Sequence, residues 1–299
     1  MDNILLAGAN GFIGTFLYNH LKNDYSIIST DYSEGFIEKD IYHLNLTVKE
    51  EVESFVDKSP KCDALIFLVG LAHKKGKGKD LHEFRSANLQ TLINLLSMLD
   101  IKNKLPDKII FSSTISVYGE KINQVIYPED SEKTPLSPYA VTKLEAEEYL
   151  LNNYSTQAWI LRFAPVYSSN FQLNIIRRTK IGDIFFRVGD GKKQFSLCNL
   201  ENIGRTIQRI LENKVPSGVY NISDAKHYTY FELLNYVNAK WILHIPKFLV
   251  KGLYYVGKMI NNIFLIENTT KLISDNIFPS NKLNQFTELP SELNDCEQC

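Results

Sequence analysis

Tyr139 and Lys143 have the side-chain types and the spacing of an acid/base pair. They lie four positions apart in the stretch SPYAVTK, residues 137–143. Residues four apart share one face of a helix, so we expect the phenol and the ammonium to lie one turn apart. The pKa of a free tyrosine is about 10, and a nearby ammonium lowers it by favouring the phenolate. An isolated pair of this kind is more often a surface Tyr and Lys, so the neighbouring motifs decide between a surface pair and an acid/base pair.

A cluster of hydroxyl side chains precedes this pair by about one helix length. Ser112, Ser113 and Thr114 close an apolar run in IIFSSTISVYG, which predicts that they end a strand. Ligands of open α/β sheets bind at the carboxyl edge of the strands. A hydroxyl beside the phenol would orient a substrate alcohol while its proton is removed.

The elements that must position these groups alternate along the chain. Short apolar runs at residues 4–6, 25–29, 41–46, 64–69, 109–112 and 159–163 alternate with helical stretches. This pattern predicts an α/β fold with a Rossmann-like, doubly wound parallel sheet. Thr47 followed by Glu50 predicts a capping box for a helix to about Lys58, and Ser137-Pro138 predicts a helix start. The longest helical stretch is expected at 81–100.

The pattern loosens after residue 163, which indicates a second domain. We predict a cofactor-binding domain at 1–165, to which 195–223 returns, and a smaller, mostly helical substrate-binding domain at 166–194 and 224–299. Helices are expected near 173–180, 230–241 and 248–263, and a strand at 218–223. The helix at 248–263 is very apolar but contains Lys251 and Lys258, which favours a packed or partner-facing helix over one on a membrane surface.

A glycine motif follows the first expected strand. GANGFIG places Gly8, Gly11 and Gly14 between that strand and the first helix. Glycines there allow a tight turn, the approach of backbone amides to a pyrophosphate and close packing of helix on strand. The helix N-terminus then faces the anion. We therefore favour dinucleotide binding over a purely structural turn.

Asp31 follows the second expected strand, where a carboxylate can accept hydrogen bonds from both adenosine-ribose hydroxyls. It would repel a 2′-phosphate, and no Arg follows it, so NAD is favoured over NADP. The alternative is a solvated loop aspartate in the turn-like DYSEG. Asn45 could bond the adenine amine or cap a turn.

Composition excludes several classes of partner. The chain has 299 residues, 33 Lys plus Arg against 34 Asp plus Glu and a formal charge of -1, so no basic field would attract nucleic acid. No run approaches a membrane span, the N-terminus does not resemble a signal peptide, and a cytoplasmic protein is expected. The four cysteines include a C-x-x-C at 296–299 that we interpret as a frayed tail; no metal site is expected.

The ordered set of motifs resembles the extended short-chain dehydrogenase/reductase family, specifically its NAD-dependent nucleotide-sugar epimerase/dehydratase branch. The resemblance covers roughly the first two-thirds of the chain. It rests on GANGFIG, Asp31, LVGLAH, Asn88, SSTISVYG, SPYAVTK and LRFAPVY, which occur in the family's order.

The resemblance implies a role for each matching position. Catalytic residues would be Tyr139 as acid/base, Lys143 as its electrostatic and ribose partner, and Thr114 as the substrate-orienting hydroxyl. Cofactor contacts would be Gly8, Asn10, Gly11, Phe12, Ile13, Gly14, Asp31, Asn45, Leu46, Leu71, Ala72, Asn88, Ser112, Tyr139, Lys143, Phe163 and Pro165. Substrate contacts would be Ser113, Thr114, Tyr139 and Lys193. A homodimer formed by the helices at 81–100 and from 138 onward is also implied.

The reaction is narrowed by a departure from the family pattern. Dehydratases of this branch carry Asp-Glu after the catalytic Thr, whereas Ile115 and Ser116 stand here. Dehydration is therefore disfavoured. We predict a UDP-hexose or N-acetylhexosamine 4-epimerase working by transient hydride transfer. The alternatives are an NAD(P)H-dependent 4-keto-sugar reductase and, from another class, a dinucleotide-sensing protein without turnover.

The diphosphate of the substrate is the least defined part of the prediction. The family often has an Arg after its G-D-G turn, but VGDGKKQFSL offers Lys192 and Lys193, which can bind phosphate as point charges or be solvated turn lysines. The HKKGKGK run at 73–79 is expected to be a solvent-facing loop rather than a phosphate site.

Overall fold

The computed structural model describes residues 2–33, 41–72, 81–119, 121–293 and 295, and the chain forms two compact units. The first unit consists of Met1–Thr114, Pro138–Arg162 and Ile207–Val219; the second consists of Ile115–Ser137, Phe163–Thr206 and Tyr220–Cys299. The cofactor and substrate roles assigned to domains from the sequence stay predictions. The HKKGKGK run and the C-x-x-C tail lie outside the described residues.

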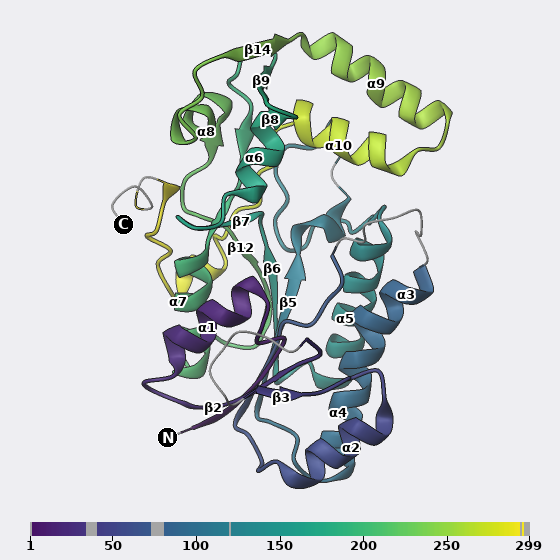
Figure 1. Cartoon of the computed structure of the whole chain (residues 1–299), viewed down its shortest axis with the longest axis vertical. Coiled ribbons are helices and arrows are strands. Elements are labelled where there is room, and N and C mark those ends of the chain that lie inside the picture. The colour runs from purple at the N-terminus through teal and green to yellow at the C-terminus, as the bar shows by residue number, and fades with distance from the viewer. Residues whose placement is uncertain (1, 34–40, 73–80, 120, 294, 296–299) are drawn as a thin grey trace. The chain divides into compact units, whose positions relative to one another are not determined.

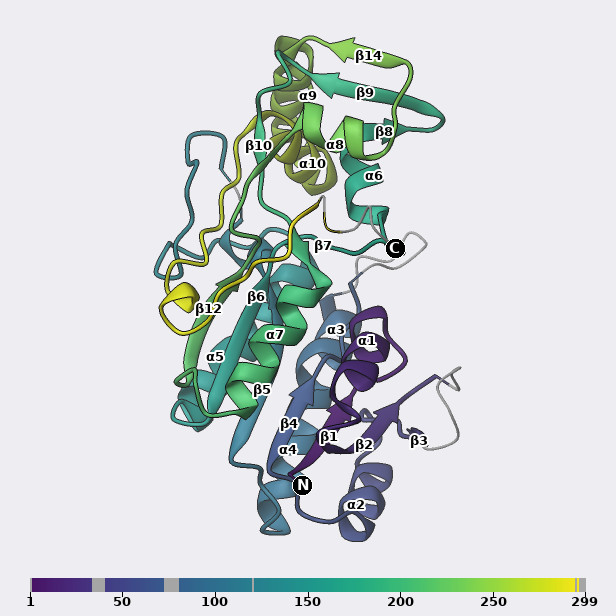
Figure 2. The ribbon, with the colours of Figure 1, turned by 90° about the vertical axis from the view of Figure 1, so that its left-hand side faces the viewer.

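The central sheet has seven strands in the order β12-β6-β5-β4-β1-β2-β3 (Figures 1 and 2). Their bounds are β1 Asn3–Ala7, β2 Ser26–Asp31, β3 Ile41–His43, β4 Ala64–Phe67, β5 Lys108–Thr114, β6 Ala158–Phe163 and β12 Gly218–Ile222. From β5 to β3 the pairings are parallel. The order reverses beside β1, as in a doubly wound Rossmann-like sheet, and the predicted fold class is confirmed. The strand predicted at 218–223 is confirmed as an edge strand.

Helices cover both faces of this sheet (Figure 1). They are α1 Phe12–Leu21, α2 Lys49–Lys58, α3 Leu81–Arg85, α4 Thr91–Ile101, α5 Pro138–Tyr154 and α7 Leu200–Leu211. Alternate residues of the strands, such as Leu65 and Phe67, pack in one core with Val52 of α2, Leu95 of α4 and Leu150 of α5. Their sheet neighbours on the other face, such as Ile4 and Leu6, are fully buried as well. Burial on both faces explains why these strands are continuously apolar.

The long helix predicted at 81–100 is interrupted. A π-helical turn, Ser86–Gln90, separates α3 from α4. Such turns occur at functional sites more often than elsewhere, and this one carries Asn88. The capping box predicted at Thr47 and Glu50 is wrong, because Val48 is the N-cap of α2 and has no side-chain cap bond. A capping box occurs instead at Thr229 and Glu232.

The second unit is built from short strands and helices around its own core. Its elements are the 3₁₀-helix Ile115–Tyr118, β7 Val166–Tyr167, α6 Leu173–Thr179, β8 Lys180–Ile181, β9 Ile184–Val188, β10 Gln194–Phe195, β11 Cys198–Asn199, β13 Tyr228–Thr229, α8 Tyr230–Tyr236, β14 Ile242–Ile245, α9 Lys247–Met259, α10 Ile263–Ile273 and the 3₁₀-helix Leu283–Gln285. The β8 and β9 strands form a hairpin, to which β14 adds in parallel. The core of this unit contains Tyr167, Phe186 and Tyr230.

The helix predicted at 248–263 is two helices. α9 ends at Met259, Asn261 adopts a left-handed conformation with φ of 50°, and Asn262 caps α10 by accepting a hydrogen bond from the Leu265 amide at 3.1 Å. The two helices then pack side by side as a hairpin (Figures 1 and 2). In the part of the chain that the structure describes, each helix is too short or too polar to cross a bilayer.

Candidate active site

The glycine motif forms the turn predicted between β1 and α1. Gly8 adopts a φ of 89°, a conformation that L side chains rarely adopt. A Cβ on Gly14 would lie 2.2 Å from the Gly8 carbonyl oxygen, so only glycine lets α1 pack this closely on the turn. Phe12 and Ile13 are half-buried in the first turn of the helix. The turn therefore has the shape that a pyrophosphate-binding loop requires.

A cavity of about 540 Å³ opens beside this turn. Its lining includes Gly8, Asn10, Gly11, Asp31, Asn45, Leu46, Gly70 and Leu71. The Asp31 carboxylate accepts hydrogen bonds from the Asn10 amide at 3.0 Å and from the Ser33 amide at 2.9 Å. These bonds fix the carboxylate at the end of β2, where an acidic residue meets an adenosine ribose in this kind of fold.

The cavity fits a dinucleotide on several counts. Its walls come from the glycine turn and from the carboxyl ends of β1, β2 and β4, the switch point of the sheet. The buried Asn10 Oδ1 accepts no hydrogen bond from the described residues, although its Nδ2 donates to the Ser33 carbonyl at 2.6 Å. A buried acceptor of this kind is costly unless a ligand donor meets it.

The sequence left two roles open for Asn45, a turn cap and an adenine contact, and its position in the structure is compatible with both. Its Oδ1 accepts hydrogen bonds from the Thr47 amide at 3.0 Å and from the Thr47 hydroxyl at 2.7 Å, which is a turn cap. The residue also lines the cavity. Leu46 lines it too, and its carbonyl accepts a hydrogen bond from Asn94 Nδ2 at 2.9 Å. An adenine contact stays a prediction for both residues.

Asn88 is buried and acts on the loop after β4. Its Oδ1 accepts a hydrogen bond from the Leu71 amide at 2.6 Å, and its Nδ2 donates to the Leu71 carbonyl and to Thr142 Oγ1 at 2.9 Å. Leu71 lines the cavity and Asn88 does not, so its bonds indicate indirect action through Leu71. Ala72, the next residue, is exposed.

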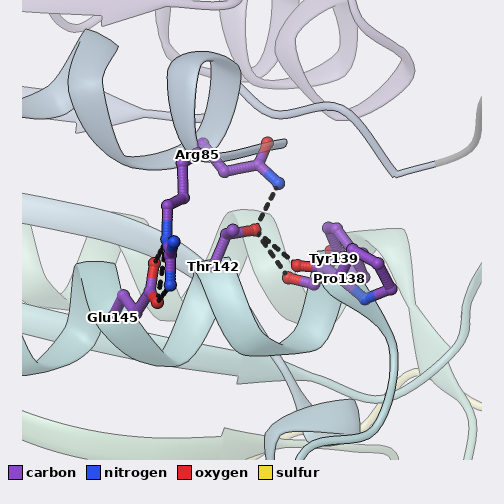
Figure 3. Close-up of polar contacts among 6 residues, drawn as sticks. Arg85, Pro138, Tyr139, Thr142 and Glu145 are labelled. Atoms are coloured by element: carbon purple, nitrogen blue, oxygen red, sulfur yellow. Dashed lines mark hydrogen bonds and ion pairs between the residues drawn. The ribbon is translucent and has the colours of Figure 1, made fainter. Parts of the chain in front are cut away.

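Thr142 joins the start of α5 to Asn88 in the π-helical turn (Figure 3). Its hydroxyl donates toward the carbonyls of Pro138 at 2.9 Å and Tyr139 at 3.1 Å while accepting from Asn88. Arg85 and Glu145 tie α3 to α5 nearby, with Nε to Oε2 at 2.9 Å. The π-helical turn and the first turn of α5 are therefore held together by side chains.

Lys143 is only 3% exposed and points at the cavity wall. Its Nζ donates to the Ser112 carbonyl at 2.9 Å and reaches the Val69 carbonyl at 3.4 Å. A Cβ on Gly70, which lines the cavity, would lie 3.0 Å from Nζ. Burial lowers the pKa of Lys143 to about 7, while the Glu147 carboxylate opposes this shift.

Tyr139 lies one turn before Lys143 on α5 and is half-buried. Its hydroxyl is hydrogen-bonded to the Thr114 side chain at the end of β5. The structure thus joins the predicted phenol and hydroxyl. The expected lowering of the Tyr139 pKa is wrong for this structure: burial raises it to about 12, and the bond to Thr114 only partly opposes this. The Lys143 ammonium is instead directed at carbonyl oxygens.

The structure corrects the prediction that Ser113 contacts the substrate. It is 3% exposed, and its hydroxyl donates a short hydrogen bond to Glu147 Oε1. Successive residues of a strand face opposite sides of the sheet, so Thr114 faces Tyr139 and Ser113 faces the core. Glu147 also pairs with Arg162, with Nη2 to Oε2 at 2.6 Å.

The sequence interpretation overlooked this buried charge pair. Two signals were available: Glu147 follows Lys143 by one helical turn, on the face that packs on the sheet, and Arg162 interrupts an apolar strand. A charge in such a position is costly unless it is paired.

The remaining predicted residues belong to the second unit. Phe163 is 7% exposed, and the Pro165 carbonyl accepts a hydrogen bond from the Cys198 amide at 3.1 Å. Lys193 is 8% exposed: its Nζ lies 3.6 Å from the centre of the Phe195 ring and donates to the Gln194 carbonyl at 3.1 Å. It is therefore not a solvated lysine, whereas the neighbouring Lys192 is exposed.

The fold and the cavity define a dinucleotide-binding α/β protein with a Tyr-Lys pair on the helix after β5. The family model described as "NAD dependent epimerase/dehydratase family" matches residues 4–223. The chain belongs to this family, and its cofactor is NAD.

Two curated relatives and one solved structure give the range of similarity. The N-acetyl-alpha-D-glucosaminyl-diphospho-ditrans,octacis-undecaprenol 4-epimerase of Escherichia coli O157:H7 is 27% identical, over 75% of this chain and 67% of its own length. The uncharacterized UDP-glucose epimerase YtcB of Bacillus subtilis (strain 168) is 30% identical, over 55% of this chain and 56% of its own. A crystal structure of UDP-glucuronic acid 4-epimerase from Bacillus cereus, with UDP-glucuronic acid and NAD, has a TM-score of 0.71 and 20% identity, over 99% and 96% of the two chains. The structural likeness shows the fold.

Proposed function

We propose that this protein is an NAD-dependent nucleotide-sugar 4-epimerase, with a UDP-hexose or UDP-N-acetylhexosamine as substrate. One observation carries the proposal: the Tyr139 hydroxyl, bonded to Thr114, lies one helical turn from Lys143, whose ammonium lies against the wall of the dinucleotide cavity at Gly70. Relatives of the chain are named as 4-epimerases or UDP-sugar epimerases. Ile115 and Ser116, in place of the Asp-Glu of dehydratases, support epimerisation over elimination.

The proposed chemistry uses the chain's own groups for proton transfer and positioning. Tyr139 accepts the proton of the sugar 4-hydroxyl and returns it, Thr114 orients that hydroxyl, and Lys143 holds the ribose. NAD, when bound, supplies an acceptor for the hydride of the sugar carbon and a positive charge that favours the phenolate. Substrate and product of a 4-epimerase are isomers, so the proposed reaction would leave atoms and electrons balanced. The enzyme therefore consumes no net oxidant.

The raised pKa of Tyr139 fits this cycle. With the pKa at about 12, the phenol stays protonated at neutral pH until a positive charge enters the site. Proton removal is thus coupled to assembly of the complex. The 4-keto-sugar reductase stays the alternative with the same groups, because a reduced cofactor and a keto sugar would use them in one direction only.

Further parts of the proposal concern the binding of the substrate diphosphate, the oligomeric state and the location of the protein. Lys193 is proposed to contact the diphosphate, supported by its burial after the G-D-G turn, and the second unit to bind the sugar. A homodimer through the helical segment 81–101 and α5 is proposed; Leu89 and Met98 of that segment and Tyr149 of α5 pack on the core but stay partly exposed. Location in the cytoplasm is proposed because Cys62 and Cys198, in the part of the chain that the structure describes, are buried and form no disulfide.

The substrate carrier has a second candidate. The relative from Escherichia coli is named for a sugar joined through a diphosphate to undecaprenol. A polyprenyl diphosphate presents the same sugar-diphosphate group as a nucleotide sugar does. The apolar exterior of α9, described below, favours keeping this lipid-linked class among the substrates tested.

The test is a turnover assay with a matched variant. The purified protein with NAD is given UDP-glucose, UDP-galactose, their N-acetyl forms and polyprenyl-diphospho-N-acetylglucosamine, and the sugars are separated. Interconversion by the wild type, and a loss of about 10²–10⁴-fold in Tyr139→Phe, are expected. Tyr149→Phe on the same helix should keep its activity. Turnover of a 4-keto sugar with reduced cofactor alone would identify the reductase, and NAD binding without any turnover would identify the sensor.

A further inference from the structure

Helix α9, Lys247–Met259, has three distinct faces. Val250, Tyr254 and Gly257 form the stripe that is buried or half-buried. The stripe packs on α10: a Cβ on Gly257 would lie 2.9 Å from Leu265 Cβ. This close approach fixes the rotation of α9 about its axis, so the remaining faces point outward.

The outward faces are apolar to an unusual degree. Phe248 is 70% exposed and Met259 is 83% exposed. Further apolar side chains on α9 are exposed by 47–54%: Leu249, Leu253, Tyr255 and Val256. At roughly 100° per residue these six side chains fall in one arc of about 160°. Ile260 and Phe264, exposed by 60% and 65% in the turn to α10 and at its start, extend the apolar surface.

Three lysines border this arc. Lys247, Lys251 and Lys258 fall within about 40° of one another on the helical wheel, between the buried stripe and the apolar arc. Helix α9 carries no acidic residue. An exposed apolar arc bordered by lysines is the arrangement of helices that lie in the surface of an anionic membrane.

We propose that α9 docks this protein on the surface of an anionic lipid bilayer. The helix lies in the plane of the interface, with the arc from Phe248 to Met259 among the acyl chains and the lysines at the phosphate groups. Its 13 residues give a contact about 20 Å long. The aliphatic part of a lysine side chain can lie along apolar groups while its ammonium reaches the phosphate groups. The apolar arc and the lysines can therefore contact the same bilayer at once.

Lipid fits this surface better than a second copy of the chain does. A self-associating face would place the lysines of two copies near one another, and α9 offers no carboxylate to pair with them. Anionic lipid supplies the opposite charge along the whole stripe.

The docking does not rest on the proposed reaction, but it deepens it. Docking would place the enzyme where a polyprenyl-linked sugar diphosphate resides, which supports testing this second candidate carrier beside the nucleotide sugars. Failure of the epimerase assay would leave lipid binding unaffected, because the vesicle experiment below contains neither sugar nor NAD.

The test is flotation of the full chain with vesicles. Binding to vesicles of phosphatidylcholine with phosphatidylglycerol is expected, with much weaker binding to phosphatidylcholine alone. Phe248→Asp combined with Met259→Asp should lower the partition coefficient by at least about tenfold. Lys251→Gln and Lys258→Gln should each lower it by about fivefold, an effect that added salt should mimic.

A matched control separates docking from loss of structure. Ile126→Asp changes an apolar side chain that is 55% exposed in the segment between β5 and α5, outside α9 and the proposed dimer helices, so it should leave both binding and the thermal midpoint unchanged. The α9 variants should also unfold at the wild-type midpoint. Equal flotation of wild type and the Phe248/Met259 double variant would overturn the proposal. So would a dimer, measured by light scattering without lipid, that this variant converts to monomer.

Discussion

Glu147 and Arg162 form a bidentate ion pair inside the first unit, with 1% and 2% of their side chains exposed. The Arg162 Nε lies 3.0 Å from Oε1 of Glu147, and Nη2 lies 2.6 Å from Oε2. Glu147 also binds the hydroxyl of Ser113, next to Thr114, and lies one turn beyond Lys143. The pair therefore connects β5, α5 and β6 directly behind the reacting groups.

Breaking this pair should be costly, because it leaves a buried charge without its partner. Glu147→Leu or Arg162→Met alone should lower the free energy of unfolding by about 3–5 kcal/mol, measured by urea denaturation. The double variant Glu147→Leu/Arg162→Met should recover most of this loss. Additive losses in the double variant would contradict the pairing.

The buried lysine predicts a dependence of stability on pH. The pKa of Lys143 is about 7 in the fold and about 10.4 when unfolded, so between these values the unfolded chain holds more protons. Lys143 should therefore make the free energy of unfolding rise with pH from about 7 to about 10, by at most about 1.4 kcal/mol per pH unit.

Comparison with Lys143→Met isolates this contribution from all other groups. The difference in stability, wild type minus variant, should increase as the pH is raised from 7 to 9.5. Above pH 10 the raised pKa of Tyr139 acts in the opposite direction, since the unfolded chain then loses the phenolic proton first. A difference that stays constant from pH 7 to 9.5 would show that Lys143 titrates as a free lysine.

Asp31 should control the choice of dinucleotide. Asp31→Asn keeps the size of the side chain but removes its charge, so the dissociation constant for NAD should rise by about tenfold or more. That for NADP should fall, because the repulsion of its 2′-phosphate is relieved. Fluorescence titration with both cofactors measures the ratio. Ser33→Ala, which removes a hydroxyl bonded to Asp31 at 2.8 Å, is the control that keeps the carboxylate. An unchanged ratio in Asp31→Asn would exclude Asp31 from the ribose site.

The sheet and the glycine turn were predictable because their signals are local. Apolar runs of three to six residues, and glycines placed between a strand and a helix, depend only on neighbours in the sequence. The hydroxyl of Thr114 and the phenol of Tyr139 could be brought together from the topology alone, since Thr114 ends β5 and Tyr139 lies in the first turn of the next α-helix, at one edge of the sheet.

The predictions that failed depended on burial, on strand register and on contacts between residues that are distant in sequence. The pKa of Tyr139 depends on how much water the fold removes, and the orientation of Ser113 depends on the register of β5, which the apolar run did not fix. The π-helical turn around Asn88 is stabilised by bonds to Leu71 and Thr142, which are distant in sequence. The division of 248–263 into α9 and α10 turns on the left-handed Asn261.

The glycine turn should separate two effects of adding one methyl group. Gly14→Ala would place a Cβ 2.2 Å from the Gly8 carbonyl oxygen, so α1 must shift and the free energy of unfolding should fall by about 1–3 kcal/mol. Gly11→Ala meets that oxygen only at 3.4 Å, an ordinary contact, so its stability should be nearly unchanged. Because Gly11 is exposed and lines the cavity, its methyl group should instead hinder the approach of the pyrophosphate and weaken NAD binding. Thermal unfolding and NAD titration of both variants check the two effects; wild-type NAD affinity in Gly11→Ala would place the pyrophosphate elsewhere.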